Sequence, residues 1–214
     1  MPDEALELST WAVHNCPEAQ RNWLSERLSG IRQGSEPDLM ELFSAAGRRL
    51  GSEFVQPGGV DTYSRFRAQD LARVAGLLSY VLQLTVESQE LLLEDLFFRG
   101  SSDEKRAVLL ALPLLEAPER YVELAVEACR TNTQTVFEAI ACENPFPAAY
   151  FSELQFNQLV LKAIFMDLDV KRIVNLSTRI GSTLIEDLNN FRREREAALR
   201  PVPAGLSWIL EKAR

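Results

Sequence analysis

The sequence predicts an all-α protein, a single domain over residues 1–214 in which helical hairpins stack as in a HEAT-like α-solenoid. Three observations support this prediction. Apolar residues recur every three or four positions, proline and capping residues divide that pattern into short segments, and the connectors between segments are short. No residue-level repeat accompanies the pattern, so the likeness to HEAT repeats concerns architecture alone.

Composition and charge limit the functions open to the chain. Its 214 residues are 46% hydrophobic and 25% charged, which is typical of a soluble globular protein with a sizeable core. The formal net charge of −8 argues against non-specific nucleic-acid binding, which needs Lys and Arg to neutralise phosphates, and against docking on anionic membranes. We therefore expect no nucleic-acid partner.

Two further features indicate a soluble, cytoplasmic protein that is not transmembrane. The first ten residues are acidic and lack the apolar core of a secretory signal, and no apolar run approaches the roughly 20 residues that span a bilayer. Cys16, Cys129 and Cys142 match no zinc-binding spacing. We interpret them as reduced thiols that act as small hydrophobic residues.

The first hundred residues contain several predicted helices. These run over residues 2–15, from Pro17 through Leu28, from Pro37 to Leu50, and over residues 67–98 with a break near residues 85–88. Residues 51–64 are a predicted surface loop without the lysine of a phosphate-binding loop. Arg65, Arg67 and Arg73 gather near the start of the last helix, where they allow a phosphate site, but we favour a solvated basic helix end.

After Gly100 the pattern changes to short helices with recognisable starts. The segments 101–104, 131–134 and 152–155 each have the spacing of a helix cap with a residue that can return the hydrogen bond. The helix of residues 152–166 is apolar on almost every side and is predicted to be buried on most of them. Residues 169–176 and 177–199 are predicted as two further helices, and Leu206, Trp208 and Ile209 as part of a closing amphipathic turn.

Eight polar residues lie within the apolar region of residues 124–176 and form the candidate binding cluster: Arg130, Asn132, Glu138, Glu143, Asn144, Asn157, Gln158 and Lys162. Buried polar groups need partners, so such a cluster is either a satisfied network or a ligand pocket or partner surface. In the network interpretation, Glu143 and Asn144 hold the corner of residues 145–147, with Arg130 or Lys162 as counter-ions. We favour the network.

Catalytic and metal-binding patterns are missing from the sequence. The chain has one histidine, His14, so a multi-histidine metal site is excluded, and neither Cys129 nor Cys142 has a histidine nearby to activate it. Glu138, Glu143, Asp167 and Asp169 could supply oxygen ligands for magnesium or calcium, but residues 167–169 are better explained as a helix terminus and cap. We expect no catalytic residue, metal site or cofactor.

Several segments of the second half resemble the EboA family. They are EACRTN from Glu127, VFEAIACENP from Val136, YF at residues 150–151, FNQLVLKA from Phe156, RIV from Arg172, and RPVP from Arg200. The resemblance covers residues 102–203, and residues 1–100 carry it only weakly. It implies a gene cluster of bacteria and some algal plastids that is tied to making or exporting secondary metabolites. The family supplies no established reaction, cofactor or catalytic residue.

Three functional hypotheses follow. The first is a non-enzymatic accessory or scaffold protein that binds a ligand or a partner, such as the prenyltransferase, metal-dependent hydrolase or sugar-isomerase-like products of the cluster. The second is an enzyme acting on a prenylated or sugar-phosphate-like metabolite, with Glu138 or Glu143 as acid and base and Arg130 and Lys162 holding an anion. The third is a homodimerising structural protein without a ligand, and the sequence leaves the oligomeric state open.

Overall fold

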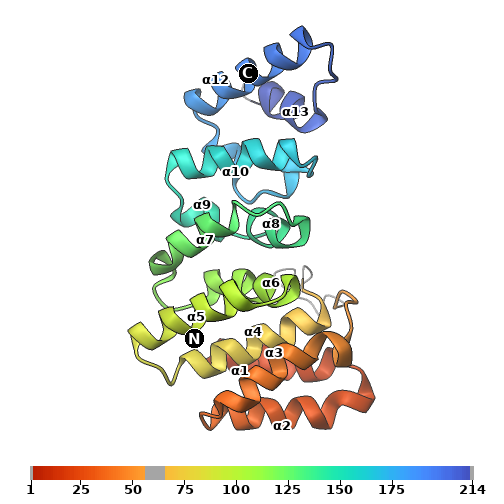
Figure 1. Cartoon of the computed structure of the whole chain (residues 1–214), viewed down its shortest axis with the longest axis vertical. Coiled ribbons are helices and arrows are strands. Elements are labelled where there is room, and N and C mark those ends of the chain that lie inside the picture. Colours follow the sequence, from red (N-terminus) through yellow and green to blue (C-terminus); the bar gives the residue numbers. More distant parts are fainter. Residues whose placement is uncertain (1, 56–65, 213–214) are drawn as a thin grey trace. The chain divides into compact units, whose positions relative to one another are not determined.

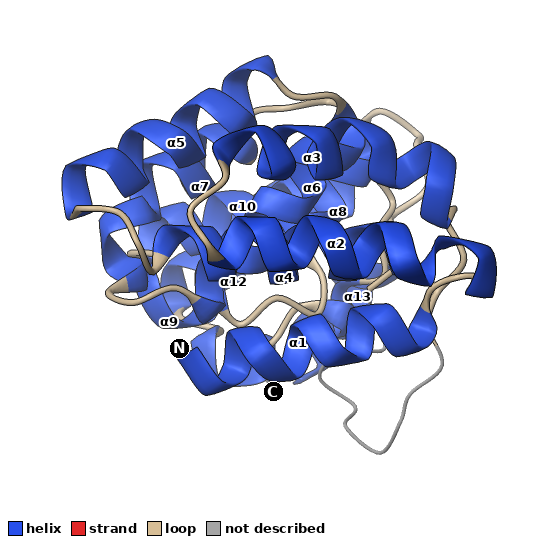
Figure 2. Cartoon of the chain, turned by 90° about the horizontal axis from the view of Figure 1, so that it is seen from below, coloured by secondary structure: helices blue, strands red, loops and turns tan. Residues whose placement is uncertain are grey.

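The computed structural model describes residues 2–55 and 66–212. Within these residues the chain forms thirteen α-helices and four short 3₁₀ helices, and it has no β-strand beyond one isolated bridge between Phe54 and Arg67 (Figure 2). The all-α prediction is therefore confirmed. Residues 56–64 of the predicted surface loop, and Arg65, lie outside the described residues.

Contacts between Cα atoms divide the chain into two compact units, Met1–Tyr121 and Val122–Arg214. The helices of the first unit appear in red to green in Figure 1. They are α1 (Pro2–Asn15), η1 (Glu18–Gln20), α2 (Arg21–Arg32), α3 (Glu36–Leu50), α4 (Ala68–Val81), α5 (Val86–Arg99), α6 (Ser102–Ala111), η3 (Leu112–Leu114) and η4 (Pro118–Tyr121).

Helix α4 is the centre of the first unit. It contacts α1, α2, α3 and α6, and every one of its residues from Ala68 to Val81 is buried. Gly76 allows the close approach of α3, because a Cβ at this position would lie 2.6 Å from a methyl group of Leu42. The predicted break between the two halves of the 67–98 stretch is confirmed, since α4 ends at Val81 and Thr85 caps α5.

The arginines at the start of α4 are not a solvated helix end, so that prediction is wrong. The side chain of Arg67 is 13% exposed and its Nε lies 3.0 Å from Oδ2 of Asp70, which is fully buried. Arg106 of α6 donates to the same Asp70 oxygen at 2.9 Å. Arg73 donates to the carbonyl of Phe43 at 2.9 Å, and burial lowers its pKa. The apolar environment of α4 thus makes its charged residues pair with one another or with a backbone carbonyl instead of facing water.

The second unit appears in green to blue in Figure 1. Its core includes Phe137, Phe146 and Phe156, all fully buried, from three successive helices. The elements are α7 (Val122–Ala128), α8 (Gln134–Ala141), α9 (Phe146–Tyr150), α10 (Glu153–Phe165), η5 (Val170–Arg172), α11 (Leu176–Arg179), α12 (Ser182–Ala197) and α13 (Ala204–Lys212).

Helix starts agree with the sequence in two of three cases. The capping boxes at Ser101 and Ser152 form as predicted. The start at Thr131 is wrong, because α8 begins after Thr133, and the Thr131 hydroxyl instead accepts the Thr133 amide at 3.1 Å. Local side-chain hydrogen bonding within a turn therefore competes with the cap.

The predicted helices of residues 169–176 and 177–199 are also divided differently. Asp169 caps only the short η5, and Asn175 adopts left-handed φ of 55° before the four-residue α11. A second interruption at Ile180 and Gly181 precedes α12. The closing amphipathic segment is confirmed as α13, which buries Leu206 and Ile209. None of the described helices is both long and apolar enough to cross a membrane.

Candidate functional site

The corner between α8 and α9 is held by Arg172 of η5. Glu143 has a left-handed φ of 49°, and its backbone N–H donates to the Arg172 carbonyl at 2.7 Å. The Arg172 guanidinium returns a two-pronged contact to the Glu143 carboxylate, at 2.6 and 3.0 Å. Backbone and side chain together therefore fix Glu143 against η5.

Glu138 lies at the edge of the same ion pair. Its Oε1 accepts a hydrogen bond from Gln134 at 2.7 Å, and its Oε2 lies 3.9 Å from Nη1 of Arg172. The hydrogen bond to Glu143 is the main reason why the pKa of Arg172 is raised, and the nearby negative charges add to it. Arg172 is the counter-ion of this corner, and the sequence-based choice of Arg130 or Lys162 is wrong.

Asn144 holds the corner from inside, as the network interpretation predicts. It is 1% exposed, donates to the Ala139 carbonyl at 2.8 Å and accepts the Phe146 amide at 3.0 Å. The Asn144 side-chain amide thus satisfies a carbonyl in the last turn of α8 and the first N–H of α9. This part of the candidate cluster is a structural network.

Lys162 of α10 binds backbone carbonyls and not a carboxylate. Its Nζ donates to the carbonyls of Cys129 and Thr131, at 2.7 and 2.6 Å, and lies 5.3 Å from the Phe137 ring centroid. Cys129 directly follows α7, where the last carbonyls of a helix lack partners and attract a cation, and Thr131 lies two residues further along the same turn. Lys162 therefore caps the C-terminal end of α7 from another helix.

Arg179 caps a second helix end in the same way. It donates to the carbonyls of Ala148 and Phe151 at the end of α9, at 2.7 and 2.8 Å. By contrast, Arg130 is 72% exposed and pairs with Glu127, three residues before it. The second unit thus uses its part-buried cations to bind backbone carbonyls.

A small cavity of about 140 Å³ lies beside Lys162. It brings together three of the eight predicted residues, Arg130, Gln158 and Lys162. The other lining residues are Val126, Cys129, Phe151, Gln155 and Leu159. Burial raises the pKa of the Cys129 thiol to about 12, so this thiol is protonated at neutral pH and is no nucleophile.

The remaining two candidates lie elsewhere. Asn132 is exposed in the turn after α7. Asn157 is 2% exposed, and neither its side-chain nitrogen nor its oxygen has a hydrogen-bond partner among the described residues. A helix turns by 100° per residue, so Asn157 lies on the side of α10 away from Gln155, Gln158 and Lys162. The structure therefore divides the predicted cluster into a corner network, a small cavity and two separate residues.

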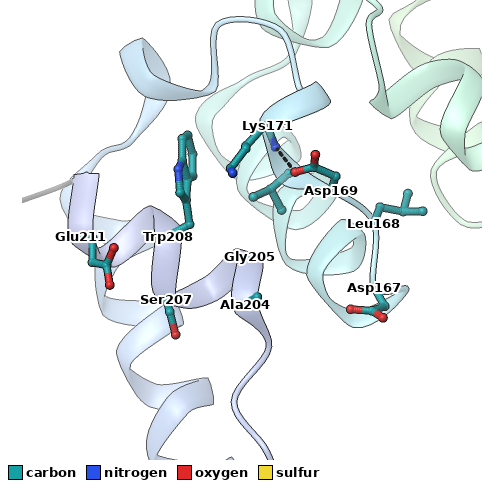
Figure 3. A pocket seen from close by; sticks show the side chains of 10 residues that line it. Asp167, Leu168, Asp169, Lys171, Ala204, Gly205, Ser207, Trp208 and Glu211 are labelled. Carbon is teal, nitrogen blue, oxygen red and sulfur yellow. Dashed lines mark hydrogen bonds between the residues drawn. The ribbon is translucent and has the colours of Figure 1, made fainter.

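A larger pocket, of about 700 Å³, was not predicted from the sequence (Figure 3). It lies between the turn of residues 167–171 and α13. Its lining residues are Asp167, Leu168, Asp169, Val170, Lys171, Ala204, Gly205, Ser207, Trp208 and Glu211. The helix terminus at residues 167–169 and the closing amphipathic turn were each predicted, but no local pattern joins residues more than 30 positions apart. In size the pocket suits a small-molecule ligand.

Together, these features describe a protein that is all-helical in its described residues, with one ligand-sized pocket, whose candidate acid–base carboxylates are tied to an arginine. In the described part of the chain, no group of three or more His, Cys, Asp or Glu side chains is placed to hold a metal ion.

Comparison with known proteins gives the family. The family described as "Metabolite traffic protein EboA" matches residues 5–211, and the chain belongs to this EboA family. No curated protein and no solved structure matches the chain.

Proposed function

We propose that this protein is a non-enzymatic accessory protein of metabolite traffic, which binds a small molecule or a partner protein in a pathway that makes or exports a secondary metabolite. The family description supports a role in traffic. The observation that carries the proposal is the state of the carboxylates: Glu143 is clamped by Arg172 at 2.6 and 3.0 Å, and Glu138 is bonded by Gln134. Groups engaged in this way serve the fold better than they serve proton transfer.

We also propose a domain architecture and a set of partner proteins. We take residues 1–214 as one cytoplasmic EboA-like domain of HEAT-like stacked hairpins, because the family match runs through both compact units. As partners we propose the prenyltransferase, metal-dependent hydrolase and sugar-isomerase-like products of the same gene cluster. The net charge of −8 disfavours nucleic acid.

The test combines the purified protein with each of these gene-cluster products in turn. We expect it to change the mobility or the activity of at least one of them on size-exclusion chromatography or in that protein's own assay. No change with any product at saturation, together with no retained metabolite, would contradict the accessory role.

One variant, Glu143→Gln, tests the alternative that the protein is an enzyme. If the chain itself converts a metabolite, Glu143→Gln should abolish turnover while the circular dichroism spectrum is kept. Glu127→Gln is the matched control, since Glu127 is also a carboxylate paired with an arginine in this unit. Under our proposal neither variant alters the protein's effect on its partner.

A further inference from the structure

Helix α10 carries an apolar stripe on its exposed side, although most of the helix is buried. Leu154 is 65% exposed and Phe165 is 78% exposed, and the part-exposed Leu161 lies between them. A helix turns by 100° per residue, so these three side chains and the exposed Gln158 fall within about 60° of one another around the helix axis. The stripe has no charged residue, whereas the exposed side of a surface helix normally carries charged and polar residues.

The 140 Å³ cavity lies beside this stripe, between α10 and the end of α7 (Figure 1). Its walls include Phe151 and Leu159, which are 4% and 1% exposed, and the part-buried Val126. The exposed Gln158 and Arg130 also line it, so the cavity opens to the surface, and Gln158 joins it to the stripe. A cavity of roughly 150 Å³ holds one benzene ring, so this cavity has room for a single aromatic or large aliphatic side chain.

The charged residues that line the cavity are positive, in a chain whose net charge is −8. They are Lys162 and Arg130, and no Asp or Glu lines the cavity. Arg130 is paired with Glu127, but in the described part of the chain the ammonium of Lys162 donates its hydrogen bonds to backbone carbonyls. Carbonyl groups satisfy these hydrogen bonds without neutralising the charge, so the cavity favours an apolar side chain that has a carboxylate next to it.

We propose that α10 and the end of α7 dock a helix of a partner protein, which places one phenyl-sized side chain in the cavity and a carboxylate near Lys162. The apolar face of that helix lies along Leu154, Leu161 and Phe165, a stripe that runs about 16 Å, or three turns, along α10. A free small molecule would fill the cavity alone, whereas a partner helix buries the cavity and the stripe together. This inference rests on the proposed function, because it locates the surface that an accessory protein would use.

The cavity is tested with two probes that carry the same ring and opposite charges, 3-phenylpropanoate and 2-phenylethylamine. Each is titrated into the isotope-labelled full chain and followed by nuclear magnetic resonance. We expect saturable shifts of the Cys129, Leu159 and Lys162 amide signals with the carboxylate, at a Kd in the millimolar range, and weaker binding of the amine. Val126→Phe, which adds a ring to the wall of the cavity, should abolish these shifts. Preferred binding of the amine, or no saturable binding, would overturn the proposal.

The docking face is tested with the gene-cluster product that comigrates with the protein. Leu154→Ser combined with Phe165→Ser should weaken that complex by roughly 10-fold or more, because apolar anchors carry most of the affinity of such a contact. The matched control is Leu91→Ser combined with Phe98→Ser on α5, a second pair of exposed apolar residues (68% and 56%), which should leave the affinity unchanged. Neither pair is buried, so both double variants should keep the circular dichroism spectrum. Equal losses for the two pairs would overturn the proposal.

A failure of this surface is distinguishable from a failure of the proposed function. If a cluster product comigrates with the protein and the Leu154 and Phe165 changes do not weaken the complex, the accessory role stands and the docking surface is wrong. If no cluster product comigrates, both proposals fail. If the same changes convert a dimer of the protein alone into a monomer on size-exclusion chromatography, the face is covered by a second copy and the partner helix is refuted.

Discussion

The charged residues of the two units differ in their burial and in the groups that they bind. In the first unit Arg67, Asp70 and Arg106 form a buried ion network around α4, and the central carboxylate is fully inaccessible. In the second unit the main ion pair, between Arg172 and Glu143, is about 40% exposed on both sides (38% and 43%). Its part-buried cations Lys162 and Arg179 bond to backbone carbonyls instead of carboxylates.

This difference shows which polar groups serve the fold and which are available for binding. Buried charges in the first unit satisfy one another, so they have no capacity left for a ligand. In the second unit the surface pairs contribute little, the carbonyl caps are saturated, and the 700 Å³ pocket is lined by exposed polar side chains. We therefore place ligand binding in the second unit.

The largest expected effect comes from breaking the network of the first unit. Asp70→Asn removes the carboxylate that pairs with Arg67 and Arg106 at 3.0 and 2.9 Å. The Arg67 and Arg106 guanidinium groups then lose this charged partner, while Arg67 keeps Asp103 at 2.8 Å. The change should cost about 3–5 kcal/mol of unfolding free energy, measured by urea denaturation. Asp95→Asn, which breaks the exposed pair with Arg99, is the control and should cost under about 1 kcal/mol. Equal losses for both variants would show that burial does not distinguish the pairs.

Lys162→Met should give the largest effect in the second unit. It keeps the length of the side chain but leaves the carbonyls of Cys129 and Thr131 without their donor, and hydrogen bonds to charged groups are worth about 1.5–3 kcal/mol. Thermal unfolding followed by circular dichroism measures the loss. Arg130→Met serves as the matched cation, since Arg130 is 72% exposed, and we expect almost no change. A larger effect at Arg130 would contradict the capping role of Lys162.

Replacing the buried Asn144 and Asn157 by leucine should change the free energy of unfolding in opposite directions. Asn144 bonds through both ends of its amide, so Asn144→Leu should cost about 1–3 kcal/mol. Within residues 2–55 and 66–212, neither end of the Asn157 amide has a hydrogen-bond partner, so Asn157→Leu should stabilise the protein by about 1 kcal/mol or more. Chemical denaturation of both variants tests the pair. Destabilisation by Asn157→Leu would mean that its amide is bonded by a bound water or ligand.

The exposed pair of the second unit should matter least for stability. Glu143→Gln weakens its contact with Arg172, but screening by water limits the cost to below about 1 kcal/mol. The pKa of Arg172 is raised by that hydrogen bond, so the guanidinium stays charged and no pH dependence arises from it below pH 10. Unfolding midpoints at low and high salt measure the effect, and a loss above about 2 kcal/mol would indicate a buried pair instead.

The thiols of the second unit, Cys129 and Cys142, should hardly react with thiol reagents near neutral pH while the protein is folded. Burial raises the pKa of Cys129 and of Cys142 from 9.0 to about 12. The folded state thus binds protons that the unfolded state releases, so these groups favour folding below pH 9 and lose that contribution as pH rises from 9 to 12. Ellman's reagent at pH 8 should react with them only after denaturation. Fast labelling of the native protein would show that this unit opens readily.

Local sequence signals were sufficient for much of the fold. The capping boxes at Ser101 and Ser152 depend on residues three positions apart, and both form as predicted. The Thr131 start failed for the same kind of reason, because a turn offered its hydroxyl a nearer amide. The buried role of Arg67 was missed because it depends on Asp70 and Asp103 meeting around one helix. That of Arg73 was missed because it depends on the Phe43 carbonyl of another helix.

By itself the sequence determined the all-helical class, most helix starts, the corner at Asn144 and the family, because each rests on neighbouring residues or on a continuous run of them. Only the tertiary structure decided the partners over long distances. It paired Glu143 with Arg172 across 29 positions, placed Lys162 on the end of α7, and set Trp208 opposite Lys171. Charge and size are properties of a single residue, but pairing depends on which helices pack together, and no local pattern records that packing.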